Sequence, residues 1–108
     1  MHGMFALVVR FDVRPGAEDD FDRLVEQTTT RIRAEEPGTL LYLCHRVQGE
    51  PGARVFYELY RDDEAFRAHE VAVHVREFHA RRKPFMAGPE RVEFLGPLGG
   101  VGKGWPGE

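Results

Sequence analysis

The chain has 108 residues, with 15 Lys and Arg against 18 Asp and Glu, so its formal net charge is −3. This length suits one domain, and 42% apolar with 31% charged residues is the composition of an ordinary globular domain, which excludes intrinsic disorder and a disulfide-rich scaffold. The slightly acidic balance gives no general attraction to phosphate backbones, so we expect no nucleic-acid partner.

The first two predicted elements are a strand and a helix. Apolar side chains alternate from Phe5 to Val13, which is strand periodicity. A turn at Pro15–Gly16 leads to an acidic first turn that begins at Glu18, as helix N-termini favour. The helical stripe Phe21, Leu24, Val25, Thr28 and Ile32 continues until Pro37 and Gly38 end the helix.

The remaining elements complete a ferredoxin-like order. Thr39–Val47 and Arg54–Tyr60 predict a hairpin with a loop at Gln48–Ala53. Asp62 or Asp63 caps a second helix, which begins near Glu64 and runs, with a kink or without one, until Pro84. Arg91–Leu95 is a short last strand. The order β-α-β-β-α-β predicts an α+β sandwich with an antiparallel sheet.

The domain spans residues 1–96, and residues 97–108 form a Gly- and Pro-rich tail that we expect to be irregular or mobile. Trp105 in this tail either docks on a partner subunit or lies in solvent. Several strands are apolar on both faces, and two helices cover only one face of a four-stranded sheet. We therefore expect a homodimer packed sheet against sheet.

The longest apolar run, Met4–Val9, is far below the ~20 residues that span a bilayer. We expect no membrane association and no export. Cys44 is the single cysteine and lies in an apolar strand pattern, so we interpret it as a core residue in a cytoplasmic protein.

Histidine is the most informative residue type. His69, His74 and His79 follow one another at intervals of five in the second helix. Residues five apart on a helix differ by about 140°, so no two of them bind one metal ion unless the helix breaks. His69 shares the stripe that faces the sheet, whereas His74 lies on the far side of an unbroken helix. His69 is therefore the candidate general base, with a packing role as the alternative.

Glu58 is a carboxylate in a strand that should be largely buried, so it needs a partner. It either pairs with Arg10 or Arg61 or orients a catalytic group. Tyr57 and Tyr60 are candidate hydrogen-bond donors to a ligand oxygen. We find no nucleotide-binding or metal-binding motif: Lys103 in the glycine-rich tail is followed by Gly104 rather than Ser or Thr. We therefore expect chemistry without a cofactor.

Three segments resemble the antibiotic biosynthesis monooxygenase domain, in particular its small quinol-monooxygenase-like members. They are Glu36-Pro37-Gly38-Thr39 with Tyr42, Glu58-Leu59-Tyr60, and Ala65-Phe66-Arg67-Ala68-His69 with His74. The last fits the family's A-H-x4-H pattern, and Glu58 fits its E-x-W strand motif with Tyr60 in place of Trp. The resemblance implies a dimeric α/β barrel with a pocket in each subunit, and oxygenation of small aromatic substrates without metal or flavin.

The residues and the resemblance together make His69 and His74 the predicted catalytic residues, and Glu58, Tyr57, Tyr60 and Val9 the predicted substrate-binding residues. The hypothesis is that His69 takes a phenolic proton from a quinol or polyphenol, the anion reduces oxygen, and His74 carries the proton out.

Three alternatives stay open. One is an isomerase or tautomerase in the same pocket, and another is a ligand-binding dimer without catalysis. The third is a haem-degrading monooxygenase, because His79 falls where that related branch carries its axial ligand. Its other two marks are missing, since Val9 and His69 replace an asparagine and a tryptophan of that branch.

Overall fold

The computed structural model, which describes residues 3–103, places the side chains of β1 (Phe5–Asp12) alternately toward a helical layer and away from it. Leu7, Val9 and Phe11 are buried under the helices, whereas Ala6, Val8 and Arg10 face the opposite side. This alternation confirms the predicted strand and sets up a two-layer architecture.

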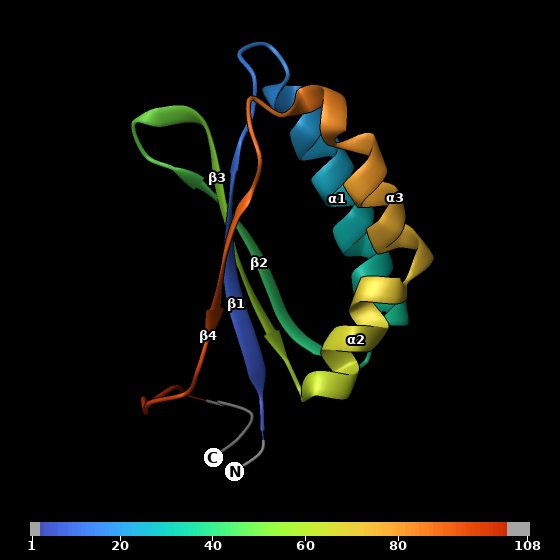
Figure 1. The fold of residues 1–108 in the computed structure, drawn as a ribbon, viewed down its shortest axis with the longest axis vertical. Helices are drawn as coiled ribbons and strands as arrows, with labels where there is room; N and C mark the ends of the chain where they lie inside the picture. Colours follow the sequence, from blue (N-terminus) through green and yellow to red (C-terminus); the bar gives the residue numbers. More distant parts are fainter. Residues whose placement is uncertain (1–2, 104–108) are drawn as a thin grey trace.

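The sheet has four antiparallel strands in the order β2-β3-β1-β4, so that β2 (Thr39–Val47) and β4 (Arg91–Leu95) are its edges. The three helices α1 (Glu18–Glu35), α2 (Asp63–Val71) and α3 (Val73–Arg81) lie together on one face (Figure 1). The ferredoxin-like α+β fold is therefore confirmed. Within residues 3–103 the sheet is open and does not close into a barrel.

The core lies between the sheet and the helices. Four aromatic rings, Phe11, Phe21, Phe56 and Phe78, pack together there, with centroids of neighbouring rings 4.9 to 6.4 Å apart. The predicted stripe of α1 is confirmed, since Phe21, Leu24, Thr28 and Ile32 are its buried residues.

The hairpin turn is shorter than predicted. Strand β3 runs from Glu50 to Tyr60, so Pro51 and Gly52 belong to the strand rather than to a loop. A side chain at position 52 would come within 2.6 Å of the Val13 carbonyl oxygen, which explains the glycine. The turn itself is made at Gly49, whose φ is +82°.

The second predicted helix is broken. Ala72, with φ −63° and ψ 139°, is extended and separates α2 from α3. Of the two predicted caps, Asp62 and Asp63, the structure has Asp62, whose carboxylate accepts a hydrogen bond from the Ala65 backbone N–H at 2.8 Å. Helix α3 ends at Arg81, and the short 3₁₀ turn Lys83–Phe85 holds Pro84.

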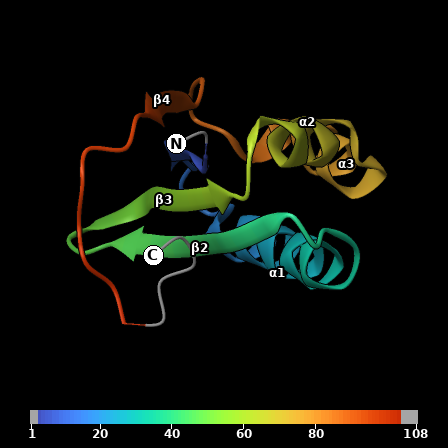
Figure 2. The same ribbon diagram turned by 90° about the horizontal axis from the view of Figure 1, so that it is seen from below.

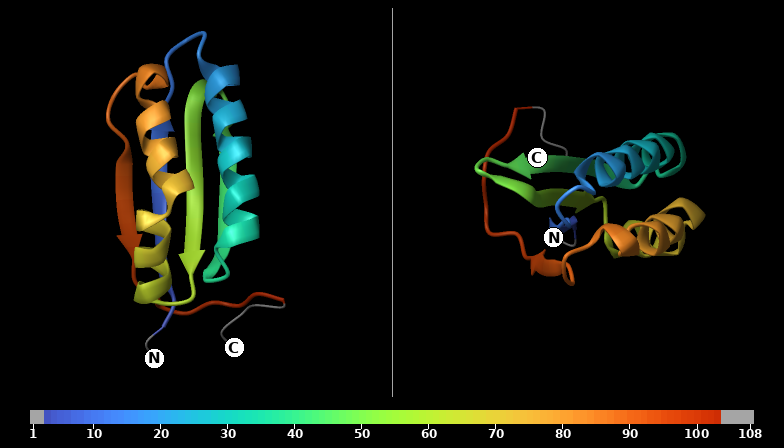
Figure 3. Two further views of the ribbon diagram at one scale, coloured as in Figure 1. Left: turned by 90° about the vertical axis from the view of Figure 1, so that its right-hand side faces the viewer. Right: turned by 90° about the horizontal axis from the view of Figure 1, so that it is seen from above.

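The sheet face away from the helices is uncovered in the described part of the chain, as Figure 3 shows from above. By the strand register it carries Val8, Leu43 and Tyr57, and Leu43 is 44% exposed. Residues 96–103 leave β4 on that side without forming a helix or strand (Figure 2). The predicted position of Trp105 lies outside the described residues.

The prediction that Cys44 is a core residue is wrong for this chain. Cys44 is exposed, because β2 is an edge strand whose second half, from Leu43 to Arg46, is exposed. Within residues 3–103, no helix has the length and apolar character needed to cross a bilayer.

Candidate functional site

The carboxylate of Glu36 lies at the centre of a buried polar cluster. Its Oε1 is 2.7 Å from His69 Nδ1, and its Oε2 is 2.5 Å from His74 Nε2. The Thr39 hydroxyl donates a further hydrogen bond to Oε1 at 2.6 Å. The three side chains Glu36, His69 and His74 are only 7%, 4% and 5% exposed. One buried carboxylate therefore holds two imidazole rings that come from two different helices.

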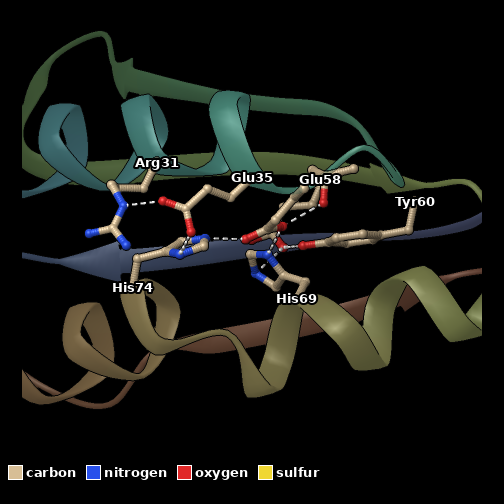
Figure 4. Close-up of polar contacts among 8 residues, drawn as sticks. Arg31, Glu35, Glu58, Tyr60, His69 and His74 are labelled. Atoms are coloured by element: carbon tan, nitrogen blue, oxygen red, sulfur yellow. Dashed lines mark hydrogen bonds and ion pairs between the residues drawn. The ribbon is translucent and has the colours of Figure 1, made fainter.

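The break at Ala72 makes this arrangement possible. In an unbroken helix, His69 and His74 would point about 140° apart. The extended Ala72 redirects the chain, so that His74, the second residue of α3, turns toward the end of α1. Figure 4 shows both rings pointing from the α2–α3 layer toward α1. The prediction that His74 lies on the side of the helix away from the sheet is therefore wrong. It assumed an unbroken helix, and the helix is broken at Ala72.

A close contact between α2 and the turn after α1 brings His69 within reach of Glu36. A Cβ added at Gly38 would lie 2.5 Å from the Cβ of Ala65, so only glycine fits there. The Arg61 backbone N–H also donates to the Gly38 carbonyl at 2.9 Å. The Pro-Gly pair thus ends α1 and also lets α2 pack closely against the turn.

The electrostatics of Glu36 favour its charged form. Burial acts to raise the pKa of this carboxyl, but hydrogen bonds from His69 and Thr39 outweigh burial and hold the pKa below its usual value. A carboxylate accepting from His69 Nδ1–H fixes the tautomer in which Nε2 is unprotonated. His69 Nε2 is then free to accept a proton.

On its other side, His69 faces Glu58. His69 Nε2 lies 3.9 Å from Glu58 Oε1, and the Tyr60 hydroxyl donates a short hydrogen bond to the same carboxyl group. Burial raises the pKa of Glu58, although the bond from Tyr60 acts against this shift. Glu58 therefore pairs with Tyr60 rather than with Arg10 or Arg61, the partners considered from the sequence. Burial and the nearby Glu58 also raise the pKa of Tyr60.

An inner cavity of about 130 Å³ lies between the sheet and the α2–α3 layer, and its walls include His69 and Glu58. Its apolar walls include Leu7, Val9, Phe11, Phe66 and Phe78, together with the ring of Tyr42. At its edge, Arg82 stacks over the rings of Phe11 and Phe78 and pairs with Glu90 at 3.0 Å.

The predicted site residues separate into two groups. Val9, Glu58 and His69 line the inner cavity. Tyr60 does not line it but packs behind its wall, with a hydrogen bond to Glu58 and ring contacts to His69 and Phe66. Tyr57 alternates with Phe56 and Glu58 along β3, so it lies on the opposite face of the sheet, away from the cavity.

His79 also lines the inner cavity, and burial lowers its pKa. A cavity of about 150 Å³ is known to hold benzene. Haem is several times larger than benzene and does not fit a cavity of about 130 Å³. No group of three or more His, Cys, Asp or Glu side chains in residues 3–103 is arranged to hold a metal ion.

Sequence reasoning gave no role to Glu36, Thr39 or Arg82. A signal for Glu36 was present, because Glu35 and Glu36 lie at the C-terminal end of α1, where the helix dipole disfavours negative charge. An acidic pair at that position needs a cationic or hydrogen-bonding partner from elsewhere. Arg82 gave no comparable signal.

Comparison with known proteins gives a consistent result. The sequence model of the family described as antibiotic biosynthesis monooxygenase matches residues 4–81. A Caulobacter crescentus structure, provisionally assigned as such a monooxygenase, is 28% identical in sequence to this chain, with a TM-score of 0.86. The match covers 91% of this chain and 92% of the Caulobacter chain. The Mycobacterium tuberculosis protein Rv0793 is 26% identical, with a TM-score of 0.84, and the match covers 92% of this chain and 99% of Rv0793. No curated protein sequence matches the chain.

Proposed function

This chain belongs to the antibiotic biosynthesis monooxygenase family, and on that premise we propose that it is a cofactor-independent monooxygenase for a small aromatic diol, with His69 as the general base. The observation that carries the proposal is the position of His69. Its Nδ1 is held by a buried carboxylate, and its Nε2 faces a largely apolar cavity.

The size and lining of the inner cavity support a substrate with one aromatic ring. A volume of about 130 Å³ is close to that of a cavity known to hold benzene. The rings of Phe11, Phe66 and Phe78 offer apolar and stacking contacts, and Glu58 with His69 offers acceptors for hydroxyl protons. A hydroquinone fits this combination, because it is flat, apolar on its faces and a donor at its edge.

A hydroquinone is also a good reductant, which is the condition for reaction with oxygen without a cofactor. In the proposed mechanism, His69 Nε2 removes a phenolic proton and the phenolate gives one electron to dioxygen. The resulting semiquinone and superoxide combine at a ring carbon to form a peroxide. Loss of water from this peroxide leaves a hydroxyquinone, so one oxygen atom enters the product and the other enters water. His69 returns its proton to the departing oxygen.

The uncovered sheet face supports the further proposal that the active form is a homodimer. Val8, Leu43 and Tyr57 lie on a face that no helix covers in the described residues. An apolar sheet face of this kind is usually buried by another layer, and a second copy of the same face would bury both.

Oxygen uptake with a panel of single-ring hydroquinones and catechols tests the enzymatic proposal. We expect consumption of one dioxygen per product, with one atom of ¹⁸O₂ in the product. His69→Ala should lower turnover by about 10²- to 10⁴-fold. Arg67→Ala, an exposed residue on the same helix, is the control and should keep full activity.

Three results would contradict the proposal. Equal turnover without oxygen would indicate isomerisation in the same pocket. Tight binding of the diols with no product in either atmosphere would indicate a binding protein. Unchanged oxygen uptake in His69→Ala would remove His69 from the mechanism.

A further inference from the structure

His69 separates two cavities. Besides the inner cavity, an outer groove of about 610 Å³ lies between the end of α1, the start of β2 and the α2–α3 layer. Glu36, Glu35 and His74 line this groove, but none of them lines the inner cavity. Among the described residues, His69 is the only one that lines both.

The two nitrogens of His69 serve the two sides. Nε2 faces Glu58 in the wall of the inner cavity, 3.9 Å away, whereas Nδ1 contacts Glu36. From Glu36 the line of contacts continues to His74 Nε2 at 2.5 Å, and His74 Nδ1 lies 3.9 Å from Glu35. Glu35 is 46% exposed and bonds to Arg31, so this line of contacts ends at solvent (Figure 4).

We propose that Glu36 is a positioning residue that couples His69 to His74, so that a proton taken up by His69 from the inner cavity is matched by a proton released from His74 into the outer groove. This inference rests on the proposed function, in which His69 is the base. It adds a defined route by which the proton's charge is balanced at the far side of His69.

The coupling follows from the charges around one carboxylate. Glu36 bears a single negative charge and contacts both rings, so it stabilises one imidazolium well but two imidazolium rings poorly. When His69 gains a proton at Nε2, a protonated His74 is therefore driven to release its Nδ1 proton toward Glu35 and solvent. When His69 gives its proton to the departing oxygen, His74 takes one back. The number of protons on the pair stays constant.

Other charged and titratable groups face the pair from each packed element. They are Glu58 from β3, Glu35 with Arg31 from α1, Glu70 from α2 and His79 from α3. None of them contacts both rings, whereas Glu36 does.

The pH dependence of turnover tests the coupling, because two variants should shift it in opposite directions. Glu36→Gln removes the negative charge that stabilises protonated His69, so the acid limb of the profile should move down by about 1 to 3 pH units. His74→Gln keeps a donor to Glu36 but removes the competing positive charge. His69 then holds its proton more strongly, and the acid limb should move up by about 1 unit. A purely structural role would lower activity at all pH values alike.

Histidine-ring NMR of the ligand-free protein gives a second readout that needs no substrate. In the wild-type protein, the His69 and His74 nitrogen shifts should titrate together in two steps, and in His74→Gln the His69 shift should titrate in one. The exposed His45 is an internal control and should be the same in both proteins.

An unchanged His69 titration in His74→Gln would overturn the coupling, even if His69 proves essential for turnover. Coupled titration in a protein that turns over no diol would refute the proposed function instead and leave the coupling of the two rings established.

Discussion

The contact between Gly38 and Ala65 gives the sharpest stability prediction, for the substitution Gly38→Ala. The added Cβ would lie 2.5 Å from the Ala65 Cβ. Carbon atoms in favourable contact are about 3.5 to 4.0 Å apart, so α2 and the turn after α1 must separate by about 1 Å or more. Overpacking of this kind costs about 1 to 3 kcal/mol.

Gly88→Ala is the matched control. A Cβ at Gly88 would meet nothing within 4 Å, and neither glycine has a positive φ. Both substitutions reduce the entropy of the unfolded chain equally, by about 0.4 to 1 kcal/mol, so this effect cancels in their difference. Gly38→Ala should therefore be about 1 to 3 kcal/mol less stable than Gly88→Ala in urea or thermal unfolding.

A double-mutant cycle assigns the loss to the named contact. Ala65→Gly alone should cost about 1 kcal/mol, because glycine disfavours a helix. Combined with Gly38→Ala it removes the clash, so the pair should show a favourable coupling of about 1 to 3 kcal/mol. Equal stability of the Gly38 and Gly88 variants, or additive effects in the cycle, would refute the reasoning. The same displacement should lengthen the bond between His69 and Glu36 and lower turnover.

Three further predictions concern charge and assembly. Asp22→Asn should lower the free energy of unfolding by about 2 kcal/mol near pH 7, because Asp22 accepts two hydrogen bonds from the buried Arg54. Burial acts to raise the pKa of Asp22, but these bonds keep it below its usual value. In unfolding experiments the wild type should therefore keep its full advantage above about pH 4 and lose it as the pH falls through the lowered pKa. Glu58→Gln should instead raise the free energy of unfolding at neutral pH by on the order of 1 kcal/mol, because burial raises the pKa of Glu58 and makes its charged form costly. This gain should vanish as the pH falls below about 4.3, where the carboxyl group is protonated in both states. A lower stability of the variant at pH 7 would contradict the prediction. Leu43→Asp should yield monomers in analytical ultracentrifugation. Val73→Asp replaces an apolar residue that is even more exposed than Leu43 but lies on α3, so it should leave the dimer intact. A monomeric wild type would remove the dimer proposal.

Much of the fold was predictable from the sequence, because local patterns determine it. The alternation in β1, the apolar stripe of α1 and the Asp62 cap each depend on residues within one element. The errors occur where a distant contact decides. Gly52 looks like a loop residue until the Val13 carbonyl is placed against it, and Cys44 looks like a core residue until β2 proves to be an edge strand.

In the site, too, features set by local sequence were predictable and features set by distant contacts were not. His69 was predictable, because its helical position alone turns it toward the sheet. The role of His74 was not, since it depends on the extended conformation of one residue, Ala72, and alanine has the highest helix propensity of all residues. Glu36 was identified only as part of a motif. Its function depends on two rings that lie 33 and 38 positions further along the chain.

The break at Ala72 and the two-ring contact of Glu36 are physically linked. A helix that continued through Ala72 would bury Glu36 with a single ring and turn His74 away from it, and the acidic end of α1 would then face its own helix dipole with less compensation. The contacts between Glu36 and His74 and between His74 and Glu35 stabilise the broken form over the continuous one. The interactions that favour the break therefore come from the end of α1 rather than from the residues of the break itself. The cluster of Glu36, His69 and His74 thus helps to determine the fold, and it is also where we propose that the chemistry of the protein takes place.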